Sequence, residues 1–322
     1  MWRTKDTEPS RKETKMPNLF WRSKDGRTIN LAETPFKSED EFERYVYDVG
    51  EILSEIFILS RQVKTPSRKD VPDIVGVDKE NNVVIIEFKN QPVDEDIIPQ
   101  VLRYAIWAET NPDSIRALWL EAKDVPDDVS INWDNLSVRI IIMAPVISVA
   151  VLRLVNKINY EVDLLEVQRF AAEGHEFILV NKREPETPAR RKITKGTPEY
   201  DREFYKEHRN NQSVEMFFAV SERIDDLVSS QGWPLEKKFN KGYIGYKHGF
   251  FNAFGLTWLG SKSFALFFKV PKETADQCQP SNWEPHRYED EWKQVLYKVD
   301  SVDIPLEEFM LLFEAAYKNI AG

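Results

Sequence analysis

The sequence contains very little cysteine and histidine, and this excludes several classes of site. Among 322 residues there are one cysteine, Cys278, and four histidines. A single cysteine cannot form an intrachain disulfide framework or a thiolate metal cage, so a reducing compartment such as the cytoplasm is expected. The histidines, His175, His208, His248 and His286, lie too far apart in the sequence to show metal-ligand spacing.

The sequence also lacks an uninterrupted apolar segment of membrane-spanning length. Its longest apolar run, Ile140 to Val155, is interrupted by Pro145 and Arg153 and is shorter than the roughly 20 residues that cross a bilayer. The first fifteen residues contain no apolar core segment, which is unlike a secretory signal. We therefore expect a disordered extension there and no membrane partner.

An excess of basic residues is absent as well. The chain has 44 Lys and Arg against 54 Asp and Glu, for a net charge of -10. This balance argues against a protein coated with phosphate-binding lysines. It is compatible with a protein that gathers acidic groups around cations and contacts phosphate only through a local basic groove.

Length and composition indicate two globular domains. A hydrophobic content of 42% with 30% charged residues is typical of a soluble globular protein, and 322 residues exceed one small core. We divide the chain into an N-terminal extension (1–32), an α/β domain (33–182), a proline-rich linker (183–198) and a smaller α+β domain (199–322) for recognition or partner binding. The linker's Arg190-Arg191-Lys192 cluster could contact a phosphate backbone or could simply be solvated.

Hydrophobic periodicity predicts the elements of the first domain. Ser38 and Glu41 have the spacing of a capping box, which begins the first predicted helix. We expect helices over 38–57, 96–109 and 148–158, and strands over 57–63, 73–78, 83–88, 117–120, 138–143, 162–169 and 177–180.

The second domain shows an amphipathic helix followed by aromatic-rich strands. We expect helices over 213–230, 289–297 and 304–319, and strands over 241–248, 250–258 and 263–270. Within it, cations and rings alternate, as expected either of core strands or of a surface that stacks unpaired bases. These residues are Lys241, Tyr243, Tyr246, Lys247 and His248.

The hairpin over residues 71–90 carries the candidate chemistry. A turn centred near residue 80 places Asp73 opposite Glu87. Because side chains alternate along a strand, Glu87 and Lys89 share one face while Phe88 points to the other. Glu87 follows four apolar residues, so its buried charge needs compensation by Lys89, by a divalent cation shared with Asp73, or by both. A purely structural Asp–Lys–Glu network is the alternative.

These residues belong to a longer pattern that resembles a known family. Pro72-Asp73, then Glu87-Phe88-Lys89, then Gln100 and Tyr104 in a Q-x-x-x-Y helix, is similar to the PD-(D/E)xK superfamily in its RecB-like branch. Residues 33–182 also resemble NucS-type nucleases. The resemblance implies a restriction-endonuclease-like core, a mixed sheet flanked by helices, in which Asp73 and Glu87 bind Mg²⁺ or Mn²⁺. Lys89 would assist hydrolysis, and Gln100 and Tyr104 would support the site or the strand.

In this family the helix before the hairpin supplies one further acidic residue near the metal. Glu39 matches that position best and Glu43 second best. We find no DNA-gripping domain of the NucS kind ahead of residue 33, so mismatch-specific cutting is not expected. The second domain weakly resembles uncharacterised domains appended to predicted nucleases.

Together these observations predict a metal-dependent nuclease, a DNA endonuclease of repair or of defence against foreign DNA. A non-catalytic nucleic-acid- or protein-binding module with the same fold is the alternative. The choice between DNA and RNA and the oligomeric state, a homodimer included, stay open.

Overall fold

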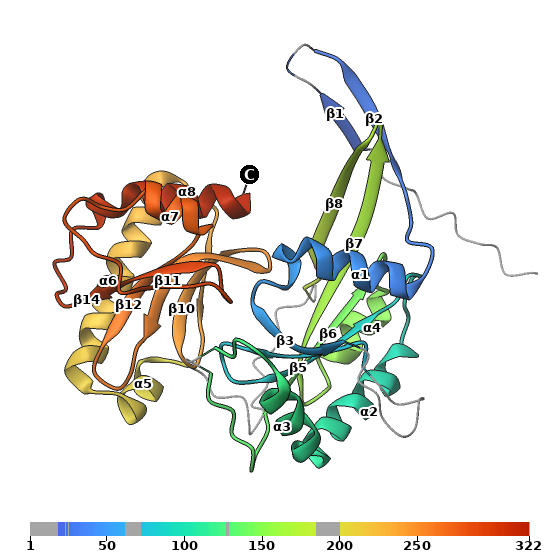
Figure 1. The fold of residues 1–322 in the computed structure, drawn as a ribbon, viewed down its shortest axis with the longest axis horizontal. Coiled ribbons are helices and arrows are strands. Elements are labelled where there is room, and N and C mark those ends of the chain that lie inside the picture. The colour runs from blue at the N-terminus through green and yellow to red at the C-terminus, as the bar shows by residue number, and fades with distance from the viewer. Residues whose placement is uncertain are drawn as a thin grey trace, which may run out of the picture.

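The computed structural model describes residues 19–22, 24, 26–61, 72–126, 129–184 and 200–321. The chain forms two units, each built on its own β-sheet, which lie side by side (Figure 1). The predicted architecture is confirmed: an α/β core with a mixed sheet flanked by helices, and a smaller unit of antiparallel strands and helices. The expected extension over 1–15 and nearly all of the expected linker lie outside the described residues.

The first unit contains an eight-stranded mixed sheet. Its strand order is β1-β2-β7-β6-β5-β4-β3, with β8 paired to β7; β5, β6 and β7 run parallel and the other pairs are antiparallel. The strands are β1 Leu19–Arg22, β2 Thr28–Glu33, β3 Ile56–Arg61, β4 Ile74–Asp78, β5 Val83–Phe88, β6 Val138–Ala144, β7 Glu161–Ala172 and β8 His175–Lys182, and the helices are α1 Glu39–Val49, α2 Ile97–Thr110, α3 Pro112–Glu121 and α4 Val149–Val155.

Helix α1 begins as predicted but is shorter. The Ser38 side chain accepts a hydrogen bond from the Glu41 amide, while the Glu41 carboxylate accepts from the Lys37 amide. The predicted extension to residue 57 is wrong. Gly50 has a φ of 69°, a left-handed conformation that glycine adopts without steric cost, and it ends the helix. A 3₁₀ turn over Glu51–Leu53 then leads into β3.

The hairpin of β4 and β5 has the predicted register. Ile74 pairs with Ile86 and Val77 with Val83, so continuation of the ladder brings Asp73 opposite Glu87. Both strands are buried along their whole length because helices cover both faces of the sheet. Val83 and Ile85 face the side covered by α2, and Val84, Ile86 and Phe88 face the side covered by α1.

Helix α3 replaces a predicted strand. Residues 117–120 were expected to be extended, but they lie in the second half of α3, which starts at Pro112. Proline is favoured in the first turn of a helix, and Ala117, Leu118 and Glu121 are good helix formers. Ile115 is the buried residue of this helix and joins the core next to α2.

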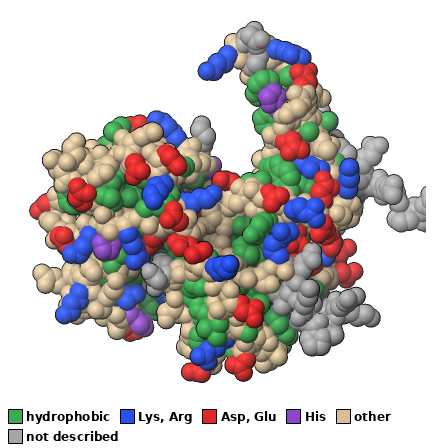
Figure 2. Space-filling view, in the orientation of Figure 1, with side chains coloured by type: hydrophobic (Ala, Val, Ile, Leu, Met, Phe, Trp, Pro, Cys, Tyr) green, Lys and Arg blue, Asp and Glu red, His purple; other side chains and the backbone are tan. Residues whose placement is uncertain are grey.

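Residues placed in the N-terminal extension take part in the first sheet. Strands β1 and β2 form a hairpin, and Ala32 and Glu33 at the end of β2 pair with Ala171 and Phe170 of β7. Together with the outer halves of β7 and β8 this hairpin forms an arm that projects from the core (Figures 1 and 2).

The second unit contains a six-stranded antiparallel sheet with the order β13-β14-β12-β11-β10-β9. Phe254 and Phe268 of this sheet pack against Phe217 of α6 and Phe313 of α8 in one aromatic-rich core. The strands are β9 Glu236–Phe239, β10 Tyr243–His248, β11 Phe251–Trp258, β12 Phe264–Lys269, β13 Arg287–Glu289 and β14 Gln294–Val299, and the helices are α5 Arg202–His208, α6 Asn211–Gln231, α7 Lys272–Gln277 and α8 Met310–Ala321.

The helix predicted over 289–297 is wrong. Gln294–Val299 forms β14 between β12 and β13, and Lys293 adopts a positive φ of 47° in the turn before it. A short apolar run does not distinguish a buried strand from a helix by its period. The pairing of residues 294–299 with β12 makes this segment a strand. Residues 304–309, predicted as the start of the last helix, include a 3₁₀ turn over Leu306–Phe309 ahead of α8.

The two units share an apolar and ionic interface. Trp292, in the turn before β14, is fully buried in a cluster with Val77, Val129 and Ile131 of the first unit. Lys79 pairs with Glu289 at 3.1 Å across the interface. Three further ion pairs among the described residues join the units: Lys269 with Glu55 at 3.0 Å, Lys293 with Glu51 at 3.2 Å and Lys238 with Glu161 at 3.6 Å.

The face of the molecule in Figure 2 is mixed in charge, and none of the described helices crosses a membrane. On the face shown in Figure 2, acidic and basic side chains alternate over both units. Within the described ranges, every helix is too short or too polar to traverse a bilayer.

Candidate active site

Four elements of the first unit bring the predicted site residues together at the open end of the β4–β5 hairpin. Asp73 directly precedes β4, Glu87 is the penultimate residue of β5, and Lys89 directly follows it. Gln100 and Tyr104 lie one turn apart on α2, and Glu39 is the first residue of α1.

Glu87 is the centre of the hydrogen-bond network. Its side chain is 2% exposed, and its Oε1 accepts hydrogen bonds from Lys89 Nζ at 2.6 Å and Gln100 Nε2 at 2.6 Å. Gln100 Nε2 also donates to the Tyr104 hydroxyl at 2.8 Å. The other oxygen, Glu87 Oε2, is buried and has no hydrogen-bond partner among the described residues. An unpaired buried carboxylate oxygen is costly, so this atom fits a bound cation.

Asp73 lies beside Glu87 and repels it. The Phe88 amide donates to Asp73 Oδ2 at 2.8 Å, which anchors the carboxylate across the hairpin. Burial raises the pKa of Asp73 to about 6, even though the Phe88 hydrogen bond acts in the opposite direction. Burial, followed by repulsion from Asp73, raises the pKa of Glu87 to about 8. Two buried carboxyl groups whose pKa values are both raised form a site that favours a cation.

Lys89 bridges the hairpin and α1. Its ammonium lies 2.6 Å from Glu87 Oε1 and 3.3 Å from Glu39 Oε1. Burial acts against the charged form, but attraction to Glu87 and the hydrogen bond with it outweigh burial and raise the pKa of Lys89. Lys89 is therefore a protonated donor at neutral pH.

The two candidate acids of α1 have different partners. Glu39 is half-exposed and contacts Lys89, whereas Glu43 is buried and accepts a 2.8 Å hydrogen bond from Arg61 Nε. Both charges act to raise the pKa of Asp73, Glu43 more than Glu39. In the described part of the chain, no three His, Cys, Asp or Glu side chains are gathered closely enough to hold a metal ion. The predicted ligand set of Asp73, Glu87 and Glu39 stays a prediction.

The sheet's core packing determines the position of this site. Phe42 of α1 packs edge-on against Phe88 with ring centroids 5.2 Å apart, which fixes the start of α1 above the end of β5. Val101 and Ala105 of α2 pack on the opposite face, next to Ile85. Glu87 thus faces α2 and Gln100, as expected from the alternation of side chains along β5.

Of the two alternatives for the alternating cations and rings of the second unit, core strands or a stacking surface, the structure favours core strands at Tyr246. The Tyr246 ring is buried in the core, and its hydroxyl lies 2.7 Å from each of two acceptors, the Ser221 carbonyl and Asp225 Oδ1, to either of which it can donate. Lys247 is also buried, while His248 is exposed. Tyr246 is therefore a core residue of its strand. The basic cluster at 190–192 lies outside the described residues.

Sequence reasoning missed a buried charged cluster where the two units meet. It includes Arg139 in β6, Asp163 in β7 and Lys182 in β8. The available signal was a charged residue inside an otherwise apolar strand, as in Val138-Arg139-Ile140 and Val162-Asp163-Leu164. Buried charges in such strands are normally paired.

Comparison with known proteins finds partial similarity to two solved structures. No model of a protein family matches the chain, and no curated protein matches it. Among solved structures, a repair endonuclease from Pyrococcus abyssi is 26% identical over 43% of this chain and 51% of that chain, with a TM-score of 0.28. A complex of EndoMS with double-stranded DNA is 19% identical over 44% of this chain and 50% of that chain, with a TM-score of 0.27. The chain thus spans about half the length of each.

Proposed function

We propose that this protein is a metal-dependent nuclease that hydrolyses phosphodiester bonds in DNA. The observation that carries the proposal is the buried pair Asp73 and Glu87, with Lys89 beside it and with Glu87 Oε2 lacking a partner in the described part of the chain. A structural ion-pair network would satisfy both oxygens of the carboxylate. Here the hydrogen bonds converge on Oε1 alone and leave Oε2 available.

Asp73 and Glu87 are the residues that would hold Mg²⁺ or Mn²⁺. Mg²⁺ typically binds one or two carboxylates, and its remaining ligands are waters and substrate phosphate oxygens. When bound, such an ion polarises the phosphoryl oxygen and lowers the pKa of a coordinated water. Lys89 and Gln100 orient the Glu87 carboxylate by their hydrogen bonds to Oε1, and partners of this kind typically contribute 10- to 100-fold to activity or metal affinity.

Lys89 acts as a charged donor in this proposal. Because Glu87 and Glu39 hold its ammonium protonated, it cannot accept a proton from water and so is not the general base. A positive donor at this position stabilises the negative charge that develops on the phosphoryl oxygens. Glu39 contributes by holding the ammonium from the α1 side.

DNA is proposed as the substrate because the matching sequence pattern is that of the NucS-type nucleases. Phosphodiester chemistry by itself does not distinguish DNA from RNA. The test therefore incubates the full chain with single-stranded, double-stranded and branched DNA and with RNA, each in Mg²⁺, Mn²⁺ and EDTA. We expect cleavage of at least one DNA substrate in Mg²⁺ or Mn²⁺ and none in EDTA.

Variants tie the activity to the site. Asp73→Ala and Glu87→Ala should each lose cleavage while keeping the circular dichroism spectrum of the native protein. Glu95→Ala, an exposed carboxylate in the loop before α2, is the matched control and should cut normally. Full activity in either site variant would refute the assignment. Absence of cutting under every condition would favour the non-catalytic binding module. Cutting of RNA alone would show that the substrate is RNA and not DNA.

A further inference from the structure

A second polar site lies between the two units, at the closed end of the β4–β5 hairpin. We call it the interface pocket; its lining includes Glu80 of the hairpin turn, Arg139, Lys182, Phe250 and two lysines of the second unit, Lys238 and Lys247. The hairpin turn is separated from Asp73 by the five residues of β4, or about 16 Å of extended chain. The interface pocket is therefore distinct from the proposed nuclease centre.

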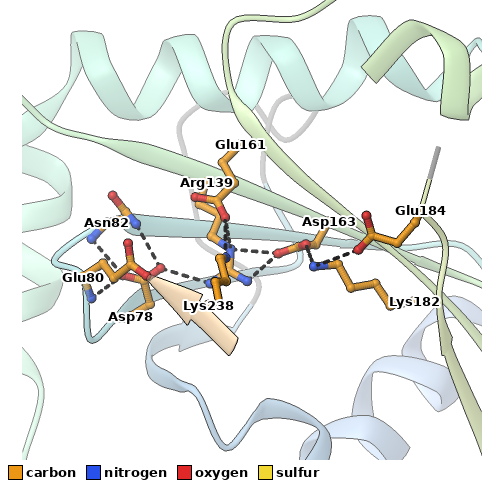
Figure 3. A network of polar contacts seen from close by, with 9 residues as sticks. All are labelled: Asp78, Glu80, Asn82, Arg139, Glu161, Asp163, Lys182, Glu184 and Lys238. Atoms are coloured by element: carbon orange, nitrogen blue, oxygen red, sulfur yellow. Dashed lines mark hydrogen bonds and ion pairs between the residues drawn. The ribbon is translucent and has the colours of Figure 1, made fainter. Parts of the chain in front are cut away.

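Most of the charges in and around the interface pocket are paired. Figure 3 shows Arg139 between Asp78 and Asp163, with Arg139 Nη1 3.1 Å from Asp78 Oδ2 and Arg139 Nε 2.9 Å from Asp163 Oδ2. Lys182 Nζ lies 2.6 Å from Asp163 Oδ1, and Lys238 Nζ lies 3.6 Å from Glu161 Oε1.

Lys247 is the exception. It is only 7% exposed, yet no hydrogen bond or ion pair joins its ammonium to any residue that the structure describes. Burial, followed by repulsion from Lys182 and Lys238, lowers the pKa of Lys247, while Glu236 and Asp163 act more weakly in the opposite direction. A cation on a largely buried side chain, repelled by two other lysines and without a counter-ion among the described residues, is destabilised, so the pocket has an unmet requirement for negative charge.

The local backbone directs this lysine. The β10–β11 ladder shifts register between Tyr246 and Lys247, so that Lys247 pairs with Asn252. A β-bulge of this kind bends the strand and re-aims the side chains next to it. Both Lys247 and Asn252 line the pocket as a result.

We propose that the interface pocket binds a phosphate group, with Lys247 as its principal donor and Lys238 as a second cation. Lysine serves as a compact point charge for phosphate. Lys238 is partly exposed and holds Glu161 only at 3.6 Å, so it can turn toward a ligand. Burial, with Asp78 next in effect, raises the pKa of Glu80 to about 7, which reduces the negative charge that would oppose an anion.

The phosphate could be a free anion or part of a nucleic-acid backbone. The two sources share the same chemistry, and separate arms of one experiment distinguish them. Metal-free full-length protein in EDTA is titrated with inorganic phosphate, with a 5′-phosphorylated dinucleotide and with single-stranded DNA that carries a 5′-hydroxyl. Binding is followed by calorimetry and by melting temperature at constant ionic strength.

Lys247→Met is the informative variant, and Lys262→Met, at an exposed lysine between β11 and β12, is its matched control. We expect Lys247→Met to weaken phosphate binding at least tenfold and to raise the melting temperature without ligand, because it removes an uncompensated charge. Lys262→Met should change neither. If Lys247→Met does not fold, Lys238→Met at the partly exposed position tests the same loss of affinity.

Two results would overturn the proposal. One is the absence of calorimetric binding of all three ligands to the wild type. The other is an equal rise of melting temperature with phosphate in the wild type, Lys247→Met and Lys262→Met, which would reflect general exclusion of phosphate from protein surfaces. Lys247-dependent binding of inorganic phosphate supports a free anion, and binding of DNA alone supports a backbone phosphate. The titration is repeated in Glu87→Ala. Unchanged binding in this variant shows that the ligand does not bind at the nuclease centre.

Discussion

Replacing Glu87 by glutamine should stabilise the metal-free protein at neutral pH. The change removes a carboxyl group that must either take up a proton on folding or carry a charge that Asp73 repels, and it keeps one oxygen to accept from Lys89 and Gln100. It also replaces Oε2, an oxygen with no hydrogen-bond partner among the described residues, by an uncharged amide group. A catalytic metal ligand is expected to be strained in this way when its metal is absent.

The magnitude follows from proton binding. An unfolded glutamate releases its proton near pH 4.5, whereas folded Glu87 holds it to about pH 8. Between these values the folded state binds more protons than the unfolded state, so its stability falls as pH rises. For a side chain 2% exposed, solvent screening is negligible. From pH 5 to pH 8 the wild type should lose about 3 kcal/mol of unfolding free energy through this group.

The assay is urea denaturation in EDTA across pH 5 to 8, with thermal melting near pH 7.5, for the wild type, Glu87→Gln and the exposed control Glu121→Gln. Glu87→Gln should flatten the pH dependence and, near pH 7.5, raise the melting temperature by about 5 to 10 °C. Mg²⁺ or Mn²⁺ should stabilise the wild type and leave Glu87→Gln nearly unchanged. A variant less stable than the wild type at pH 7.5 would refute the reasoning and identify Glu87 as a stabilising partner of Lys89.

Three further predictions concern other residues. Lys89→Ala should lower turnover but keep or slightly strengthen Mn²⁺ binding, measured by calorimetric titration; lost metal binding would make Lys89 a structural partner of Glu87. Trp292→Ala should cost about 3–5 kcal/mol in urea denaturation because it empties a buried interunit cluster, and an unchanged midpoint would mean that the units do not depend on this contact. Asp163→Asn should cost roughly 3–5 kcal/mol by leaving Arg139 and Lys182 without their shared carboxylate. Attraction to those cations outweighs burial and lowers the pKa of Asp163. The stabilisation of the fold by Asp163 is therefore fully present above the pKa of an unfolded aspartate and is lost as the pH falls below it. An Asp163→Asn variant whose unfolding free energy falls with acid as steeply as that of the wild type would contradict this.

The interface changes what is expected of a shortened chain. Sequence patterns alone favour an independent second domain that selects the substrate. In the structure, removal of residues after 184 would uncover Val77, Val129 and Ile131, which Trp292 buries. We expect such a truncation to aggregate, and light scattering would detect this directly.

Local patterns determined much of the candidate site. The turn between β4 and β5 and the two-residue period of the strands were enough to predict that Asp73 lies opposite Glu87. The Ser38 cap was likewise encoded in neighbouring residues. These features depend on interactions between residues close in the sequence, so a single sequence contains the information needed to predict them.

Tertiary contacts decided the rest. Residues 117–120 and 294–299 are short apolar segments whose period suits either a helix or a strand, and their partners in the fold settled the choice. Whether Glu39 or Glu43 reaches Lys89 depended on how α1 packs on Phe88. The pairing of Lys79 with Glu289 joins residues 210 positions apart, and the burial of Lys247 likewise depends on how the units dock. No local pattern encodes such contacts, because they arise only when separate sheets meet and exclude water from the charges between them.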